Sequence, residues 1–288
     1  MKSYPHLFTK LFCQPLMLHP PTRQSFESVL LDRLVVGASA RVMPRADSTE
    51  PRELNVREMS DGVERVYQKA GNVAVITIDG AIDKRVSQMD MECMGGGVDL
   101  CDIDEALAFA MGDNVDKIVL DIASPGGSVV GVHETYSRIL AACQAKEVHA
   151  YINTQACSAA YYLASACDHI AAAPSAVVGS IGVYMALIDQ SRRLNAEGIT
   201  VNVMQGGKWK TVGADYKPLA DDERAMLQAK VDGLYVQFKA AVNERRPQVE
   251  DATMQGQWFD ASEGFTLGLV DELTGETLDE YVTRLLMQ

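Results

Sequence analysis

A single serine opens the alanine-rich stretch QACSAAYYLASACD, residues 155–168, which carries no charge until its last residue. From the residues alone, Ser158 has two interpretations. A serine at a helix start accepts hydrogen bonds from the free amides of the first turn, whereas a serine beside a base is a nucleophile. Because a hydroxyl is a weak nucleophile by itself, the choice depends on which bases the chain offers.

Histidines and lysines are the available bases. The histidines are His6, His19, His133, His149 and His169. The lysines after Ser158 are Lys208, Lys210, Lys217, Lys230 and Lys239. A lysine acts as a base only where desolvation lowers its pKa toward neutrality from about 10.4. Lys208 and Lys210 flank Trp209 after a glycine pair, in QGGKWKTVGADYKPL, which makes them the candidates.

A glycine turn lies upstream, in DIASPGGSV, residues 121–129. Gly126 and Gly127 separate a predicted strand from a predicted helix, and glycines let a ligand approach the backbone amides closely. Such a turn can hold a developing oxyanion, but it is also a common strand-to-helix connection. The chain has no GxSxG, SxxK, HExxH, GxGxxG or GxxxxGK[ST] motif, so the usual hydrolase, zinc, dinucleotide and P-loop sites lose their support.

Alternating strand and helix patterns must position these segments. The predicted strands are 73–82, 117–124, 147–153, 169–174 and 200–206. The predicted helices are 102–113, 128–146, 189–198 and 221–246. An apolar stripe on the last helix comprises Leu227, Val231, Leu234, Phe238 and Val242, and we interpret it as core or subunit interface. The alternation predicts βαβ crossovers and an α/β fold with a mainly parallel sheet flanked by helices.

Composition excludes some classes of function. Lys and Arg total 26 against 39 Asp and Glu, and the net charge of −13 argues against nucleic-acid binding. The 6 cysteines form no CxxC pair, which favours reduced thiols in a cytosolic chain. No apolar run approaches the roughly 18 to 20 residues that span a bilayer. The first residues are not typical of a signal peptide, so we expect a cytoplasmic protein without a membrane anchor.

The chain divides into an arm and one domain. We predict that residues 1–65 form an N-terminal arm and linker, with a possible short helix in SFESVLLDRL. We predict that residues 66–288 form a single α/β domain. The segment 86–97, VSQMDMECMGGG, is either a flap near the site or a surface loop.

Five segments in order carry a resemblance: SPGG, ACSAAYYLASACD, VVGSIGVYM, GGKWKTVGADYKPL and FTLGLVDEL. Over roughly residues 70–275 the chain resembles the signal peptide peptidase A (protease IV) family of Ser-Lys serine peptidases, especially its bacteriophage branch of head maturation proteases. The resemblance implies a Clp protease/crotonase-like fold built from repeated ββα units. It also implies assembly into rings and no metal or other cofactor.

Carried over by position, the resemblance makes Ser158 the nucleophile and Lys210 the general base. The family's lysine follows the aromatic residue, here in GKWK, which favours Lys210 over Lys208. Ser180, in GSIGV, is implied as the hydroxyl that orients the lysine. The implied oxyanion hole consists of Gly127 and the amide of Ala159, with Gly126 shaping the turn.

The chain departs from the cellular enzymes at Ala159 and Ala160, which follow the nucleophile where those enzymes usually have glycines. It departs from some phage relatives because it ends at 288 without their scaffold-like tail. The acidic composition and the absence of an anchor favour a prohead protease that cleaves capsid or scaffold polypeptides in the host cytoplasm or the immature phage head. We therefore expect protein substrates and a homo-oligomer.

Four alternatives stay open at this point. They are a cellular signal-peptide-peptidase-like protease, a crotonase-like acyl-CoA enzyme that does not need Ser158, a Clp-type Ser-His-Asp peptidase with His169, and a structural protein with a cryptic dyad. Two local interpretations accompany them. Cys157 is interpreted as a small buried residue rather than a second nucleophile, and Tyr161 and Tyr162 as helix packing residues.

Overall fold

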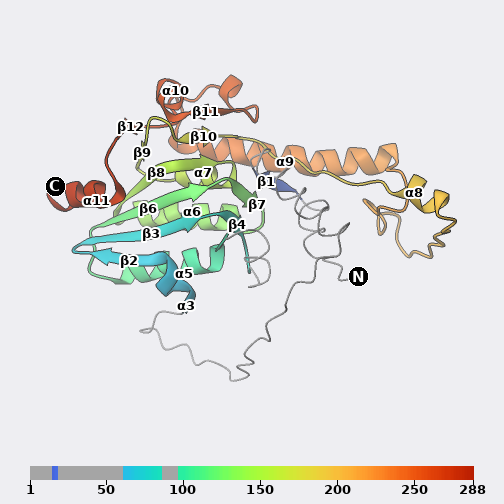
Figure 1. The fold of residues 1–288 in the computed structure, drawn as a ribbon, viewed down its shortest axis with the longest axis horizontal. Coiled ribbons are helices and arrows are strands. Elements are labelled where there is room, and N and C mark those ends of the chain that lie inside the picture. The colour runs from blue at the N-terminus through green and yellow to red at the C-terminus, as the bar shows by residue number, and fades with distance from the viewer. Residues whose placement is uncertain (1–14, 19–60, 86–96) are drawn as a thin grey trace.

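The computed structural model describes residues 15–18, 61–85 and 97–288. Within these residues a mainly parallel sheet carries helices on both faces, and a long helix extends away from it (Figure 1). The α/β class with a mainly parallel sheet is confirmed, and the repeated ββα unit stays a prediction. The predicted helix in SFESVLLDRL and most of the 86–97 segment lie outside the described residues.

The strands form two sheets. The larger one has the order β11-β10-β8-β6-β3-β2, with β9 paired to β8 and β12 paired to β9, and the smaller one has the order β1-β7-β4-β5. The strands are β1 (Leu16–Leu18), β2 (Tyr67–Ala70), β3 (Val73–Asp79), β4 (Ala81–Asp83), β5 (Gly97–Asp99), β6 (Lys117–Ser124), β7 (Gly126–Ser128), β8 (Glu147–Cys157), β9 (His169–Ala172), β10 (Val177–Gly179), β11 (Trp258–Asp260) and β12 (Glu272–Leu273).

The helices cover and extend these sheets. They are α3 (Asp61–Val66), α5 (Leu100–Gly112), α6 (Val132–Cys143), α7 (Ala159–Ala164), α8 (Ser191–Ala196), α9 (Asp221–Arg245), α10 (Ala261–Thr266) and α11 (Leu278–Leu286), with a 3-10 turn at Asp251–Thr253. Alternate residues of a strand face opposite sides of its sheet. On β3, Ala74 and Ile76 belong to the main core with α5, α6 and α7, whereas Val73 and Val75 pack beside Tyr281 of α11.

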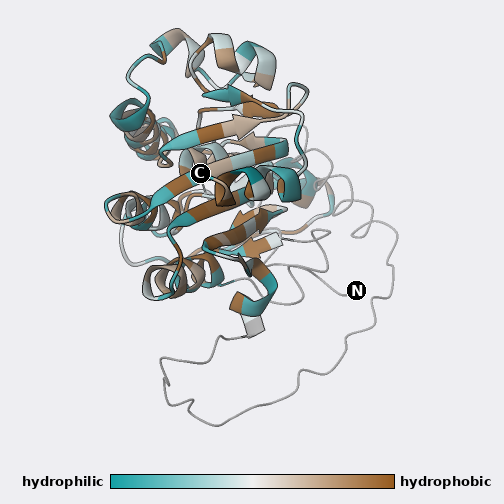
Figure 2. Ribbon diagram, turned by 90° about the vertical axis from the view of Figure 1, so that its left-hand side faces the viewer, coloured by the Kyte–Doolittle hydropathy of each residue, from teal (hydrophilic) through white to brown (hydrophobic). Residues whose placement is uncertain are grey.

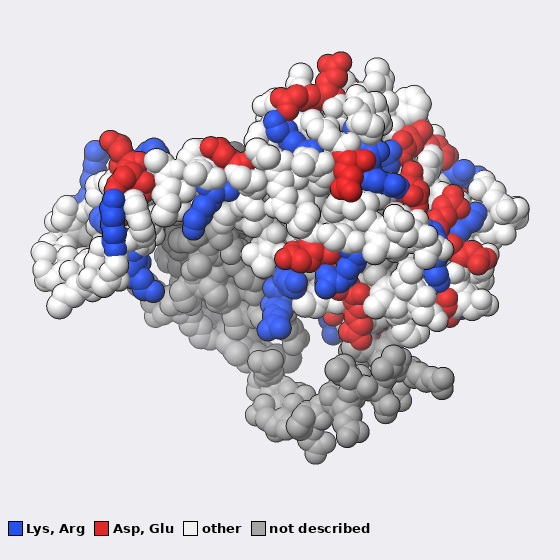
Figure 3. Space-filling view, turned by 180° about the vertical axis from the view of Figure 1, so that it is seen from behind, with Lys and Arg blue, Asp and Glu red and all other residues white. Residues whose placement is uncertain are grey.

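Hydrophobic residues concentrate along the strands (Figure 2). The sheet is therefore buried on both faces, which agrees with the continuous apolar runs that predicted the strands over 117–124 and 147–153. On the face shown in Figure 3, acidic and basic side chains are interspersed over the described surface.

Most predicted elements are confirmed, with two boundaries moved by glycines. The predicted strand over 73–82 is divided between β3 and β4 at Gly80, whose φ is +79°. The predicted helix over 128–146 begins only at Val132, after Gly131 at φ +88°, because its first residue belongs to β7.

One predicted strand is wrong. Residues 200–206 have no regular structure and lie exposed between α8 and α9. The β-branched residues of this segment favour a strand, but a strand needs a neighbour that supplies its hydrogen-bond partners, and no described strand pairs with it. In Figure 1, α8 and the loop that leads to α9 project away from the sheet.

The long helix is confirmed, and only its second half joins the core. α9 begins at Asp221 and ends before Pro247, as its acidic start and proline stop predict. Of its apolar stripe, Phe238 and Val242 are buried, whereas the residues of the first half are only partly buried. The apolar residues in the first half of the stripe are therefore not packed in the hydrophobic core.

Candidate active site

Ser158 lies between the carboxyl end of β8 and the first turn of α7. Its backbone has φ +56° and ψ −118°, a region that residues with a side chain rarely adopt, and its exposed fraction is 1%. The Ser158 amide donates to the carbonyl of Gly179 at 2.8 Å. The side chain makes no capping hydrogen bond to α7, so the helix-cap interpretation is not supported. The strained backbone instead fixes where the hydroxyl points.

Ser180 occupies the equivalent position on the neighbouring strand. β10 pairs with β8 in parallel, with Gly179 opposite Cys157, so Ser158 and Ser180 are the next residues of each strand. Ser180 also has a positive φ, +54°, and its amide donates to the carbonyl of Gln257 at 2.7 Å. Both serines line one cavity of about 320 Å³. The structure thus brings the two predicted hydroxyls together.

The predicted glycine pair adjoins the start of α7. Gly126 has φ +94°, and a β-carbon built on it would lie 2.7 Å from the carbonyl oxygen of Cys157 and 3.0 Å from the amide nitrogen of Ala159. A β-carbon on Gly127 would lie 1.8 Å from the carbonyl oxygen of Ile82. Side chains are therefore excluded at both positions. The glycines let the β7 backbone approach the amide that follows Ser158.

Lys210 is not beside Ser158 within the single chain. It is exposed, in the loop between α8 and α9, and it does not line the serine cavity. None of the residues 182–222 is buried, so the whole projecting segment has no core of its own. Lys208 in the same loop binds Asp222 with an N···O distance of 2.7 Å and lies over the ring of Trp209. The Lys208 amine therefore forms a surface ion pair with Asp222.

Histidine is no better placed to serve Ser158. Among the described residues that line the serine cavity there is neither a histidine nor a lysine. His169 pairs in register with His149 near the start of β8 and contacts Glu272 at 2.9 Å. Because an extended strand rises about 3.3 Å per residue, positions 149 and 158 are roughly 30 Å apart. His169 therefore cannot serve as the base for Ser158 within one chain.

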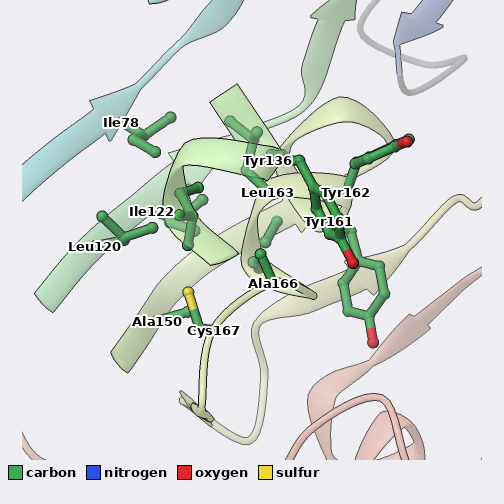
Figure 4. Close-up of a cluster of buried hydrophobic side chains, with 14 of the residues drawn as sticks. Ile78, Leu120, Ile122, Tyr136, Ala150, Tyr161, Tyr162, Leu163, Ala166 and Cys167 are labelled. Atoms are coloured by element: carbon green, nitrogen blue, oxygen red, sulfur yellow. The ribbon is translucent and has the colours of Figure 1, made fainter. Parts of the chain in front are cut away.

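Cys157, Tyr161 and Tyr162 are buried packing residues, as interpreted from the sequence, and the two tyrosines belong to the hydrophobic cluster shown in Figure 4. Burial raises the pKa of Cys157 to about 12, so its thiol stays protonated and does not compete as a nucleophile. Tyr161 is fully buried and donates to the carbonyl of Leu269 at 2.9 Å. Tyr162 stacks on Phe238 with ring centroids 4.7 Å apart. These contacts fix α7 against α9 and the C-terminal segment.

The sequence did not reveal three other contributors to the cavity. Leu18 reaches it from β1, Tyr184 from the segment after Ser180, and Asp232 from α9. β1 is too short to show a periodic pattern, and it lies in a stretch with several prolines. No sequence signal available here identifies it.

The chain is similar to known peptidases over most of its length. The model of peptidase family S49 matches residues 141–286. The chain is 30% identical to capsid assembly protease C of Escherichia phage lambda over 291 residues, which cover 96% of this chain and 64% of the phage protein. It is 28% identical to head-tail preconnector protein GP5 of Enterobacteria phage P21 over 279 residues, with coverages of 94% and 55%.

A bacterial protein is similar over a shorter region. The chain is 29% identical to protease 4 of Salmonella typhi over 212 residues, which cover 70% of this chain and 32% of that protein. The chain therefore spans less than two thirds of the length of each of these relatives. Within the described residues, none of the helices combines the length and apolar character needed to cross a membrane.

Proposed function

Because the chain belongs to peptidase family S49, we propose that it is a serine endopeptidase in which Ser158 is the nucleophile and Lys210 the general base. The observation that carries the proposal is the strained, buried and uncapped Ser158 beside the β7 glycines. A backbone with φ +56° costs of the order of 1 to 3 kcal/mol, and a serine with a purely structural role gains nothing from it. A nucleophile gains from it, because the strained backbone holds the hydroxyl at a fixed angle.

The proposed chemistry uses the Ser158 hydroxyl, the Lys210 amine and two backbone amides. The Lys210 amine takes the proton of Ser158, and the hydroxyl oxygen attacks the carbonyl carbon of a peptide bond. The amides of Gly127 and Ala159 stabilise the resulting oxyanion, and one such donor is worth about 2.7 to 4 kcal/mol. The protonated lysine then gives its proton to the leaving amine, and water hydrolyses the acyl-enzyme. Ser180, which shares the cavity, orients the lysine.

We further propose that Lys210 serves Ser158 of a neighbouring copy. The segment that carries Lys210 projects from the body and exposes Ile199, Val201, Val203, Met204 and Trp209 by 42 to 95%. Apolar residues gathered on an unburied segment are typical of a surface that a partner covers. Docking against a second copy would also remove water from around a lysine, and dehydration is what favours the uncharged, basic form of an amine. A homo-oligomer would therefore complete the site.

For substrates we propose capsid or scaffold polypeptides of a phage, processed in the host cytoplasm or the immature head. The similarity to capsid assembly protease C over 96% of this chain supports this role over that of a cellular protease. A crotonase-like acyl-CoA enzyme would use the glycine amides without a strained serine, and a structural protein would use neither.

Co-expression with phage capsid and scaffold polypeptides as candidate substrates tests the role. We expect mass spectrometry to find shortened capsid or scaffold chains with the unaltered protein and full-length chains with Ser158→Ala. Full-length chains in both cultures, with the protease folded and present in the particles, would reject this substrate class.

A further inference from the structure

The strand β1, Leu16–Leu18, lies in a slot beside the candidate active site. It pairs antiparallel with β7, with Leu16 opposite Ser128, Met17 opposite Gly127 and Leu18 opposite Gly126. On its other side, the Leu16 amide donates to the carbonyl of Tyr184 at 2.9 Å, and the Tyr184 amide donates to the Leu16 carbonyl at 3.1 Å. All three residues of β1 are no more than 4% exposed. The segment is thus held on both backbone edges.

The pairing defines which carbonyl faces the site. Because Leu16 directs its N–H and C=O at Tyr184, the alternation along an extended strand turns those of Met17 toward β7, opposite Gly127. A β-carbon built on Gly126 would lie 2.2 Å from the Met17 carbonyl oxygen and 3.0 Å from the Ala159 amide nitrogen. The Met17 carbonyl oxygen and the Ala159 amide therefore both lie beside Gly126, and Met17 lies opposite Gly127, whose amide is the other proposed oxyanion donor.

Leu18, the residue after Met17, also lies next to the candidate site. Leu18 lines the cavity that holds Ser158 and Ser180. Among the described residues of this segment, Met17 lies opposite Gly127 and Leu18 lines the serine cavity, so the bond between them adjoins the proposed site. The Met17 side chain packs with the main hydrophobic core, so the pocket at this position accepts an unbranched apolar side chain of that size.

We propose that Leu16–Leu18 occupies the peptide groove of the site as a substrate would, with the Met17 carbonyl in the place of the scissile carbonyl, and that it keeps other peptides out until it is displaced. This inference rests on the proposed function, whose site it regulates. It also gives the substrate class: extended segments with an apolar residue on the amino side of the cleaved bond. Antiparallel addition to β7 supplies affinity through the backbone, and the Met17 pocket supplies selectivity.

A tethered occupant is a strong competitor. A segment of the same chain acts at an effective concentration of the order of 1 mM. Against a free peptide with a Kd of about 0.1 mM, occupancy by β1 weakens the apparent binding roughly ten-fold. Displacing β1 should therefore raise the apparent affinity for the free peptide by roughly ten-fold.

The test measures binding without catalysis. A fluorescein-labelled pentapeptide QPLML is titrated, by fluorescence anisotropy, with assembled full-length Ser158→Ala and with the double variant Ser158→Ala/Met17→Pro. Proline removes the amide that faces Gly127 and the freedom of φ, so β1 cannot hold its register. We expect at least about ten-fold tighter binding by the double variant. Pro15→Ala in the same background, just outside the strand, is the matched control and should bind as weakly as Ser158→Ala.

A second variant and a second peptide serve as further controls for the binding measurement. Leu16→Pro removes the amide that donates to Tyr184 and should give the same gain. A QPLDL peptide should not bind, because its carboxylate would enter the apolar pocket. Equal affinity of Ser158→Ala and of a folded β1 variant overturns the proposal. Unfolding of both proline variants also overturns it, because β1 would then be a structural strand.

Peptide hydrolysis separates this inference from the proposed function. With Ser158 intact, Met17→Pro should cleave a QPLML-containing peptide with a KM roughly ten-fold lower than the unaltered protein. Tighter binding without any cleavage would reject the peptidase function and leave the groove assignment standing. Cleavage with unchanged binding and KM would reject the groove assignment alone.

Discussion

Replacing Ser158 by alanine is expected to lower kcat/KM for peptide hydrolysis by about 10⁴- to 10⁶-fold, the range found when a serine nucleophile is removed. The loss is large because every bond-making step passes through this hydroxyl oxygen. Folding should be unaffected, because the hydroxyl makes no capping hydrogen bond to α7 and alanine has the same backbone preferences near φ +56°. Steady-state hydrolysis of a fluorogenic peptide, with thermal unfolding measured in parallel, checks both statements.

Two matched variants sharpen this prediction. Ser165→Ala removes another buried serine of the same region, which donates to the carbonyl of Tyr162 at 2.7 Å, and should leave kcat/KM within about two-fold while lowering stability by about 1 kcal/mol. Ser158→Gly should also be inactive, yet it should raise stability by about 1 kcal/mol, because glycine adopts a positive φ without strain. An active Ser158→Ala protein would show that the strained serine is not the nucleophile.

Replacing Lys210 by alanine is expected to lower kcat by about 10²- to 10⁴-fold, the usual contribution of a general base. Lys210→Arg should be equally inactive, because a guanidinium stays protonated and cannot accept the proton of Ser158. Lys208→Ala is the matched control. Since Lys208 is already paired with Asp222 on the surface, its removal should change kcat less than about two-fold.

The rate of the Lys210→Ala protein decides the role of this lysine. A folded Lys210→Ala protein with the full rate would remove Lys210 from the mechanism, and Ser158 would then need another base.

The residues around Ser158 show how far a sequence can predict a site. The strand–serine–helix order and the glycine turn are local features, and parallel pairing of β8 with β10 brings the carboxyl ends of these strands to one edge, so Ser158 and Ser180 line one cavity. The cap interpretation could be rejected only from the structure, because a cap and a nucleophile share the same sequence position.

What the sequence could not predict has a common physical cause, which is that the partner of a segment lies far along the chain or outside it. The segment 200–206 has the residues of a strand but no described strand beside it. Lys210, the proposed base, does not line the cavity of Ser158 in a single chain. Leu16–Leu18 forms a strand only because β7 and Tyr184 offer their backbone edges, and a three-residue strand carries no periodic signal of its own.

Mixing the two inactive variants measures most directly whether residues 158 and 210 act together across copies. Ser158→Ala retains the base and Lys210→Ala retains the nucleophile, so random mixed assemblies contain sites with both groups intact. With one serine and one lysine per site drawn from adjacent copies, about a quarter of the sites of an equal mixture, and about a quarter of the unaltered activity, should return. Mixed assemblies that are verified by native mass spectrometry and remain inactive would contradict the account.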